Sequence, residues 1–550
     1  MKQINPILKL DYPDPDVIRV GNTYYMVSTT MYFMPGCEIL RSYDLVHWEH
    51  ASYVYERLDS TDRQRLEGKE NAYGNGMWAA SLRYHEGKFY VCFVANDTHK
   101  TYLYTSKKID GPWEKSELSG FYHDNSILFD DDGKVYIVYG NREIHITELD
   151  LEKGCAIEGG LDKVIVKDED DAPLGYEGAH FYKIEGKYYI FFIHIPKSTG
   201  KRTESCFVSD KPEGPYYGKD ICDDDRNYRG SGVAQGGVVQ SPKGNWYGIF
   251  FQDSGAVGRI PVLVPVHFEK TSKDNLGPDL TDDKYLFPVV GDNGKIPESF
   301  EIENLNLGYS YAPLVGSDDF SAKAKGNTTD YKLSNFGLKS FWQFNHEPDL
   351  SLLSKCQDDD GKSYIKITTG KISTNLVQAK NTLTQRCAFP GCKASVSLLG
   401  ENMKVGDYAG LCLLESCYSF IGLTRKEDGF YIVTCARVIT ENGFWGQRND
   451  DKKPTIIDSV KVSEPKVTLS ATVCFDMASC DEAFIKHVNH DDAVRFSYQL
   501  KDKLSTNRLG PACGLEFKLD HFTGARFGLF IYSTKETGGS AYFSDFKYER

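Results

Sequence analysis

The sequence predicts an all-β protein in which a five-bladed β-propeller is followed by a β-sandwich of jelly-roll-like type. Two observations predict the propeller. One short pattern occurs five times in the first 250 residues, and each copy joins two strand-like runs through a Gly turn and closes on Tyr. Helical periodicity is scarce, and short apolar runs are separated by Gly, Asp and Asn. Such repeats are typical of propellers, because a small antiparallel unit buries its faces only against its neighbours.

The five repeats define the five expected blades in order. The closing Tyr residues are separated by 65, 46, 53 and 58 residues, which suits a four-stranded blade with loops of variable length. The fifth blade continues through the apolar run at residues 258–266, after which the strand pattern is lost between residues 270 and 297. The propeller is therefore expected to cover residues 1–296. The repeated turns lie at residues 20–25, 86–90, 132–136, 185–189 and 243–247.

A second β-rich domain is expected over residues 318–550. Residues 297–317 are rich in Asn, Gly, Pro and Ser, which indicates a linker. Beyond them, short alternating strands continue to the end of the chain, as is typical of a sandwich of two sheets. The clearest strands are expected at residues 364–367, 394–398, 410–413, 429–433 and 526–531.

Composition narrows the classes of function. A chain of 550 residues is too long for one core, so two or more domains are expected. The formal net charge of −14 at pH 7 argues against nucleic acid or a membrane surface as a partner, since both need a basic face. No apolar stretch approaches the ~20 residues that a membrane helix requires. A neutral substrate fits this composition, and an oligomer is compatible with it.

The 14 Cys residues are expected to be reduced. Most lie singly inside strand-like runs, as Cys92 does, where Cys behaves as a small buried hydrophobe. The close pairs Cys387 with Cys392 and Cys412 with Cys417 lack accompanying His, so no zinc site is expected. Reduced thiols, and a start without the apolar core of a signal peptide, favour a cytoplasmic location. A signal peptide removed before this sequence begins would instead indicate secretion.

Equivalent positions in the repeats carry the side chains best suited to chemistry. The residue eleven positions before the closing Tyr of the first copy is Asp14. In the other four copies, the residue twelve positions before the closing Tyr is Trp78, Asp124, Glu177 or Gln235. The innermost strands of a propeller surround one channel, so these five positions are expected to converge on its axis. Three acids in one register exceed what turns require, although each acid could instead cap its own hairpin.

Three convergent carboxyl groups point to hydrolysis of a glycosidic bond. In that reaction one carboxyl protonates the leaving oxygen and another activates water or attacks carbon. Asp14 lies between two prolines that restrict the backbone, which suits a rigid general base. Glu177 has aromatic and small neighbours that would raise its pKa, which suits a general acid. Asp124 would orient Glu177 and keep its pKa high by like-charge repulsion.

Several segments occur in an order that resembles a known family. In the first domain they are residues 5–8, 12–15, 28–36, 42–49, 78–84, 123–126, 177–180 and 255–259, and in the second they are residues 342–348, 381–386 and 523–528. The chain resembles glycoside hydrolase family 43, in the branch of arabinofuranosidases and xylosidases with a C-terminal sandwich. The resemblance implies hydrolysis with inversion, with Asp14 as base, Asp124 as the residue that tunes pKa and Glu177 as acid. Ala79 and Asn125 stand where many relatives have Pro, which could shift loop geometry.

The resemblance also implies which residues hold the sugar. Similar proteins place an Arg of the last blade at the cleavage point, here Arg259, which could otherwise form a surface salt bridge. Trp78 and Phe33 would supply aromatic walls, or else pack in the core. Gln235 lies near the place where many relatives have a His that reaches calcium or a water cluster. The chemistry needs no cofactor, and a structural calcium ion is compatible with the sequence although no clear motif indicates one.

The leading hypothesis is an inverting exo-glycosidase. It would remove terminal L-arabinofuranosyl or D-xylosyl residues, or both, from arabinoxylan, xylan or arabinan oligosaccharides. In some relatives a loop of the sandwich narrows the pocket, which favours removal of terminal sugars. Two alternatives remain open. One is a non-catalytic carbohydrate-binding protein, and the other is an endo-arabinanase, which usually lacks a second domain such as residues 318–550.

Overall fold

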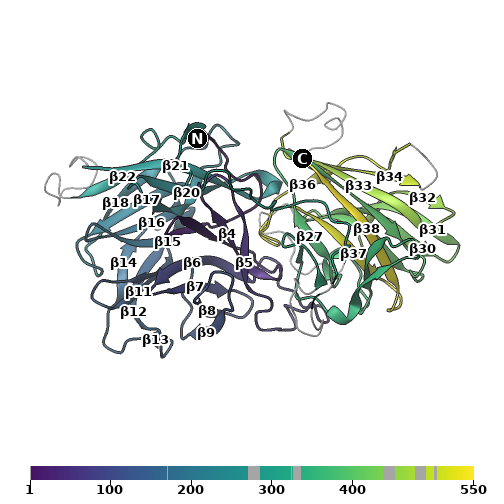
Figure 1. The fold of residues 1–550 in the computed structure, drawn as a ribbon, viewed down its shortest axis with the longest axis horizontal. Coiled ribbons are helices and arrows are strands. Elements are labelled where there is room, and N and C mark those ends of the chain that lie inside the picture. The colour runs from purple at the N-terminus through teal and green to yellow at the C-terminus, as the bar shows by residue number, and fades with distance from the viewer. Residues whose placement is uncertain are drawn as a thin grey trace.

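The computed structural model describes residues 2–169, 171–270, 285–323, 325, 336–437, 452–476, 491–500 and 505–550. Over these residues the chain forms two β-rich bodies side by side, the first coloured purple to teal and the second green to yellow (Figure 1). The first is a five-bladed propeller and the second a sandwich of two sheets, which confirms the predicted fold class.

The propeller consists of five antiparallel sheets in which strands consecutive in sequence are neighbours, except that β13 and β14 of the third blade both pair with β12. The repeated Gly turn joins the first two strands of each blade, as the sequence predicts. The blades are β2 (Asp16–Val20), β3 (Thr23–Ser28), β4 (Gly36–Ser42) and β5 (Glu49–Tyr55); β6 (Met77–His85), β7 (Lys88–Ala95), β8 (Lys100–Ser106) and β9 (Glu114–Leu118); β10 (Ser126–Phe129), β11 (Val135–Asn141), β12 (Glu143–Asp150), β13 (Cys155–Ala156) and β14 (Asp162–Lys167); β15 (Leu174–Ile184), β16 (Lys187–Ile195), β17 (Thr203–Ser209) and β18 (Tyr217–Cys222); and β19 (Val233–Gln240), β20 (Trp246–Asp253), β21 (Arg259–Lys270) and β22 (Leu286–Val290), with the short helix η1 (Gly255–Val257) between β20 and β21.

The first strands of the blades contact one another in order around the axis, and β19 contacts β2 to close the ring. The N-terminal segment runs along the last blade and strengthens this closure. The Asn5 side chain donates to the carbonyl of Leu263 and accepts from its N–H, at 2.7 and 3.0 Å. The N–H of Tyr12 donates to the carbonyl of Arg259 at 2.9 Å. These bonds hold the chain in place just before it enters β2. Outside the blades, β1 (Lys2–Ile4) pairs with β23 (Ser299–Glu301).

The second body is a sandwich of two antiparallel sheets. One sheet has the order β24-β27-β37-β29-β30-β31-β32, and the other has the order β25-β26-β38-β28-β33-β34, with β35 and β36 both pairing β34. All five strands that the sequence predicts here lie within observed strands. The elements are β24 (Gln343–Phe344), η4 (Leu350–Leu352), β25 (Leu353–Gln357), β26 (Ser363–Thr368), η5 (Leu376–Gln378), β27 (Leu383–Arg386), β28 (Gly391–Leu399), β29 (Asp407–Leu414), β30 (Ser419–Lys426), β31 (Gly429–Ala436), β32 (Thr455–Val462), β33 (Lys466–Cys474), β34 (Asp492–Leu500), β35 (Asn507–Arg508), β36 (Cys513–Leu515), β37 (Arg526–Ser533) and β38 (Ser540–Glu549).

The two bodies share one hydrophobic cluster, which continues from the propeller into the sandwich. Arg386 of β27 is buried at this junction, with 2% of its surface exposed. It donates to the carboxylate of Glu38 at 2.8 Å and to the carbonyl of Asp11 at 2.7 Å. Its guanidinium also lies 4.1 Å from the ring centroid of Tyr12. Because a buried charge is stable only when it is paired, these contacts bind the sandwich firmly to the propeller.

The segment predicted as a linker lies against the first blade. The N–H of Leu305 donates to the carbonyl of Tyr43, and the N–H of Ala312 donates to Glu49, both at 2.8 Å. The boundaries at residues 296 and 318 stay a prediction.

Cys474, at the end of β33, is disulfide-bonded, whereas the other twelve cysteines in the described ranges are free. The prediction of reduced thiols was therefore wrong for Cys474, because a cysteine inside a strand-like run was interpreted only as a buried hydrophobe. The cytoplasmic location stays a prediction. Within the part of the chain that the structure describes, no helix is long and apolar enough to cross a membrane.

Glu204 of β17 is a buried acid without a partner. It is 0% exposed, and within the described ranges neither carboxyl oxygen has a hydrogen bond. Burial therefore raises the pKa of Glu204 well above its ordinary value of 4.5. The folded protein keeps a proton that the unfolded chain loses near pH 4.5, so this group lowers the stability of the fold progressively as the pH rises above that value.

We expect Glu204→Met to raise the free energy of unfolding at pH 7 by about 1–3 kcal/mol, because it removes a desolvated carboxyl without changing side-chain length much. Thermal unfolding followed at pH 5 and pH 8 would measure it, with the larger gain expected at pH 8. Glu204→Gln is the matched control, since it cannot ionise but still buries an unsatisfied polar group. An equal gain for Glu204→Met at both pH values would contradict this interpretation.

Candidate active site

The equivalent positions of the five repeats converge on one pocket at the junction of the two bodies. Its volume is about 410 Å³, including the open mouth. Of the predicted residues, Asp14, Trp78, Asp124, Glu177, Gln235 and Arg259 line it. The sequence gave no site role to the other lining residues, which are Pro13, Thr29, Met31, Ala79, Arg202 and Phe522.

Backbone conformation turns the acids toward the axis. Asp14 and Asp124 have φ angles of 51° and 48°, although neither is Gly. Each lies two residues before the first strand of its blade, β2 or β10. Non-Gly residues rarely adopt this conformation, which costs about 1–3 kcal/mol, and residues that do so cluster at functional sites. Gly178, with φ of 67°, follows Glu177, and a Cβ there would lie 2.1 Å from Cδ of Gln235.

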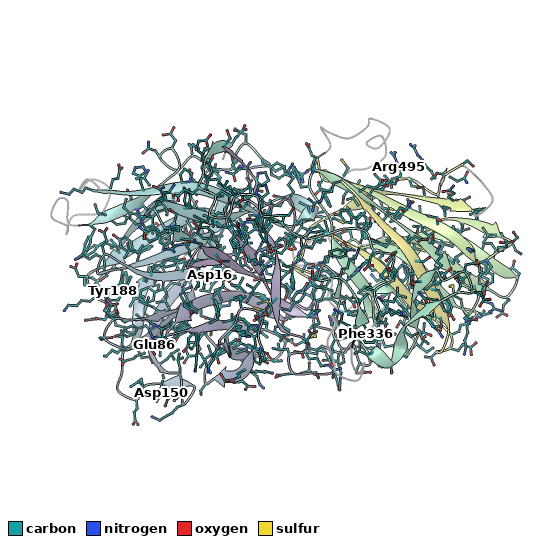
Figure 2. All side chains as sticks on the ribbon, viewed as in Figure 1. Asp16, Glu86, Asp150, Tyr188, Phe336 and Arg495 are labelled. Carbon is teal, nitrogen blue, oxygen red and sulfur yellow. The ribbon has the colours of Figure 1, made fainter. Side chains whose placement is uncertain are left out.

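Asp16 fixes the strand that follows Asp14. It lies toward the centre of the propeller (Figure 2) and is 1% exposed. Its Oδ2 accepts from the N–H of Leu82 and from Nη1 of Arg83, both at 2.7 Å, and its Oδ1 lies 3.1 Å from Nδ1 of His180. One carboxylate thus joins β2, which follows Asp14, to β6 and β15, which contain Trp78 and Glu177.

Both carboxylate oxygens of Asp14 have donors. The hydroxyl of Thr29 donates to Oδ2 at 2.7 Å, and Nη1 of Arg259 donates to Oδ1 at 2.8 Å. Asp14 and Arg259 are 7% and 9% exposed, so the pair is largely removed from solvent. The carboxylate is therefore held in one orientation at the pocket wall.

Asp124 and Glu177 form a coupled group with His123. Nε2 of His123 lies 3.9 Å from Oδ2 of Asp124 and 3.6 Å from Oε2 of Glu177. Burial, together with the negative charges of Glu177 and Asp14, raises the pKa of Asp124 to about 7, although the charge of His123 opposes this shift. Burial would lower the pKa of His123, but the two carboxylates raise it to about 9.

The pKa of Glu177 shifts in the direction opposite to the one expected from the sequence. Burial raises it, but the contact with His123, the charges of His123 and Arg202 and a hydrogen bond from Nδ2 of Asn141 together lower it. The prediction that Asp124 keeps the pKa of Glu177 high was therefore wrong. Asp124 and Glu177 therefore share one proton, and the pair as a whole titrates near neutral pH. His123 precedes Asp124 directly, so its position was a usable signal, whereas nothing in the repeats pointed to Asn141.

The sandwich supplies one wall of the pocket. Phe522 lies in the loop between β36 and β37, and its ring meets that of Trp78 edge-on, with centroids 5.5 Å apart. Cζ of Arg259 lies between the rings of Phe251 and Phe522, 4.7 Å from each centroid. Phe522 lies outside the propeller repeats, so their pattern gave no indication of it.

Phe33 does not line the pocket. Its ring is fully buried, and the guanidinium of Arg526 lies 3.5 Å from its centroid. The prediction that Phe33 forms a sugar-binding wall was therefore wrong, and the core-packing alternative holds. Met31, two residues earlier and with a φ angle of 53°, lines the pocket instead.

Among the described residues, His123, Asp124 and Glu177 form the one group of side chains close enough to share a metal ion, with ligand atoms within 4.8 Å of one another. An ion held there would occupy the carboxyls that the sequence assigns to acid chemistry. Gln235 presents an amide rather than a His at the fifth axial position. That the chemistry needs no cofactor stays a prediction.

Comparisons with known proteins agree over both bodies. The family model "Glycosyl hydrolases family 43" matches residues 4–271, and the model "Beta xylosidase C-terminal Concanavalin A-like domain" matches residues 332–549. A beta-xylosidase of Formosa agariphila is 26% identical over 98% of this chain and 88% of its own length. A non-reducing end alpha-L-arabinofuranosidase of Bacteroides ovatus is 28% identical over 62% of this chain and 63% of its own length.

Solved structures give the same result. A bifunctional GH43-CE protein of Bacteroides eggerthii is 36% identical and aligns with all of this chain at a TM-score of 0.81, and this chain spans 63% of that protein. An engineered GH43 glycoside hydrolase that displays endo-xylanase and exo-arabinofuranosidase activity is 26% identical, with a TM-score of 0.82 over 100% of this chain and 99% of its own.

Proposed function

Because this chain belongs to glycosyl hydrolases family 43, we propose that it is an inverting exo-glycosidase that releases terminal L-arabinofuranosyl or D-xylosyl residues from xylan- or arabinan-derived oligosaccharides. The chain is a glycoside hydrolase. The observation that carries the finer proposal is the narrow pocket where Asp14, Asp124 and Glu177 meet, with Phe522 of the sandwich across from them. Relatives named for each sugar support both choices.

The base side of the reaction belongs to Asp14. Thr29 and Arg259 orient its carboxylate, which takes a proton from the water that attacks the anomeric carbon. Arg259 also carries a positive charge beside the forming oxocarbenium-like state, so its pairing with Asp14 keeps the local charge balanced. Attack from the face opposite to the leaving group inverts the configuration.

The acid side belongs to the coupled carboxyls. Asp124 and Glu177 together hold one proton below about pH 7. That proton passes to the glycosidic oxygen through Glu177, whose side chain is the more exposed of the two. After bond cleavage the pair carries two negative charges, which His123 stabilises from 3.6 and 3.9 Å.

The test is hydrolysis of an aryl α-L-arabinofuranoside and an aryl β-D-xyloside side by side, with Glu177→Gln as control. We expect turnover of at least one substrate, and proton NMR should detect the inverted sugar as the first product. Retention of configuration would contradict the inverting mechanism. Sugar binding without turnover would favour the non-catalytic alternative, and internal cutting of linear arabinan would favour an endo-arabinanase.

Phe522→Ala is expected to lower kcat/KM on the preferred aryl glycoside about 3- to 30-fold, because Arg259 loses an aromatic partner whose cation–π contact is worth about 0.5–2 kcal/mol. Steady-state kinetics measure the effect. Phe522→Leu is the matched control, since it keeps the apolar wall but removes the aromatic face. An unchanged kcat/KM in both variants would show that this loop contributes nothing to the site.

A further inference from the structure

Asp253, the last residue of β20, contacts two arginines from different blades. It lies directly opposite Arg259 in the pairing of β20 with β21. Its Oδ1 is 3.4 Å from Nε of Arg259, and its Oδ2 accepts a hydrogen bond from Nε of Arg202 at 2.5 Å. Arg202 directly precedes β17, so one carboxylate joins the fourth blade to the fifth at the pocket.

The same two arginines share an aromatic neighbour. Cζ of Arg202 lies 5.4 Å from the ring centroid of Phe251, and Cζ of Arg259 lies 4.7 Å from it. Cations at these distances from a ring face are stabilised by its negative potential. Phe251 and Asp253 are alternate residues of β20, and both contact the two guanidinium groups. The positions of the arginines are therefore set by one short stretch of strand.

Charges of alternating sign follow one another beside the pocket. Arg259 donates to Asp14 on the base side at 2.8 Å. Asp253 follows, and then Arg202, whose positive charge acts on Glu177 on the acid side. His123, Asp124 and Arg259 are the other charged groups whose charges act on, or are acted on by, Glu177. Each member of this row has a neighbour of opposite charge. Removal of one charge therefore changes the electrostatic potential both at Asp14 and at Glu177.

Arg202 has hydrogen-bond donors that are available to a ligand. Its side chain is 16% exposed and lines the pocket, and Nε is the atom that bonds to Asp253. Its two Nη groups make no hydrogen bond to the residues that the structure describes. A sugar presents hydroxyl oxygens, which accept hydrogen bonds from such groups.

We propose that Asp253 is a positioning residue that holds Arg259 toward the base Asp14 and Arg202 toward the acid Glu177, and that Arg202 is a substrate-binding residue that donates to hydroxyl oxygens of the sugar. This inference rests on the proposed glycosidase function and adds a binding residue from the fourth blade to it. The carboxylate of Asp253 then links the base side of the site, at Asp14, to the acid side, at Glu177.

Kinetics of Arg202→Met and Asp253→Asn test the proposal on the aryl glycoside that the unmodified protein turns over. Arg202→Met is expected to lower kcat/KM about 10- to 100-fold, mostly through KM, because it removes charged hydrogen bonds to the substrate. Asp253→Asn is expected to lower kcat more than it raises KM, because Arg259 is no longer held toward Asp14. Unchanged constants in both variants would overturn the proposal.

The pH profile supplies a readout that a purely structural role would not change. Arg202→Met removes a positive charge near the acid pair, so the basic limb of kcat/KM is expected to move to higher pH. Asp253→Asn removes a negative charge, so the same limb is expected to move to lower pH. Lys201→Met is the matched control: Lys201 is adjacent, contacts Asp225 at 3.3 Å and does not line the pocket, so its removal should leave the limb in place. Shifts of equal sign in Arg202→Met and Asp253→Asn would contradict the proposal.

A crystal structure of Asp253→Asn separates this inference from the proposed function. Loss of the 2.8 Å contact between Arg259 and Asp14, or displacement of Arg202 from the pocket, is expected whatever sugar the protein takes. Both arginines in their original positions would overturn the positioning role. If the unmodified protein turned over neither aryl glycoside, the proposed function would fail, and this structural result would still decide the role of Asp253.

Discussion

Glu177→Gln should lower kcat about 10²- to 10⁴-fold on aryl glycosides with a poor leaving group, because the departing oxygen is no longer protonated. The loss should shrink strongly on a dinitrophenyl glycoside, whose leaving group departs without a proton. The amide can still accept the hydrogen bond from Asn141, so the fold around the site is preserved. Steady-state kinetics on the two substrates give the comparison.

The pH dependence of the Glu177→Gln variant provides a second criterion. In the unmodified protein the basic limb reports loss of the proton from the coupled pair, whose Asp124 has a pKa of about 7. Without Glu177 that proton has no route to the leaving oxygen, so the basic limb should flatten. Equal losses on both leaving groups, with the limb intact, would exclude Glu177 as the acid. A thermal melt of the variant controls for misfolding.

Asp14→Asn should lower kcat by a similar factor, about 10²- to 10⁴-fold, but to the same extent on both leaving groups. The reason is that water must lose a proton whichever group departs, and an amide cannot accept it. Arg259 also loses the nearer of its two carboxylate partners, so a lower thermal stability is expected.

Thr29→Val is the graded control for Asp14. It removes the hydroxyl that donates to Oδ2 and leaves the carboxylate and Arg259 in place. A loss of about 10- to 100-fold is expected, in line with one hydrogen bond to a charged group. If Asp14→Asn lost no more activity than Thr29→Val, Asp14 would not be the base.

Much of the propeller could be predicted because its information is local and repeated. The Gly turn and the closing Tyr recur in every blade, and counting back from them reaches residues that line one pocket, from Asp14 to Gln235. The strands of the sandwich were found by their alternation alone, which gives their positions but not their order in the sheets.

The parts of the site that could not be predicted depend on contacts between distant segments. Phe522 reaches the pocket across the domain junction, and Asn141 meets Glu177 from the end of another strand. The sign of the pKa shift of Glu177 follows from such neighbours, so the local environment gave the wrong answer. The prediction that Phe33 forms a wall for the sugar was wrong for a similar reason, because the buried Arg526 that covers its ring is far away in sequence.

Arg386 is buried between the bodies and bonded to Glu38 and Asp11, and it therefore restricts which sandwich domains can replace this one during evolution. A sandwich taken from a homologue would have to bring a cation to the same spot, or leave the buried carboxylate of Glu38 with His50 as its remaining partner. It would also have to bring a loop that reaches the pocket as Phe522 does. Exchange of propeller and sandwich together between relatives should therefore give stable, active proteins. Chimeras that exchange the sandwich alone should lose stability or activity, even when each domain folds well in its own parent.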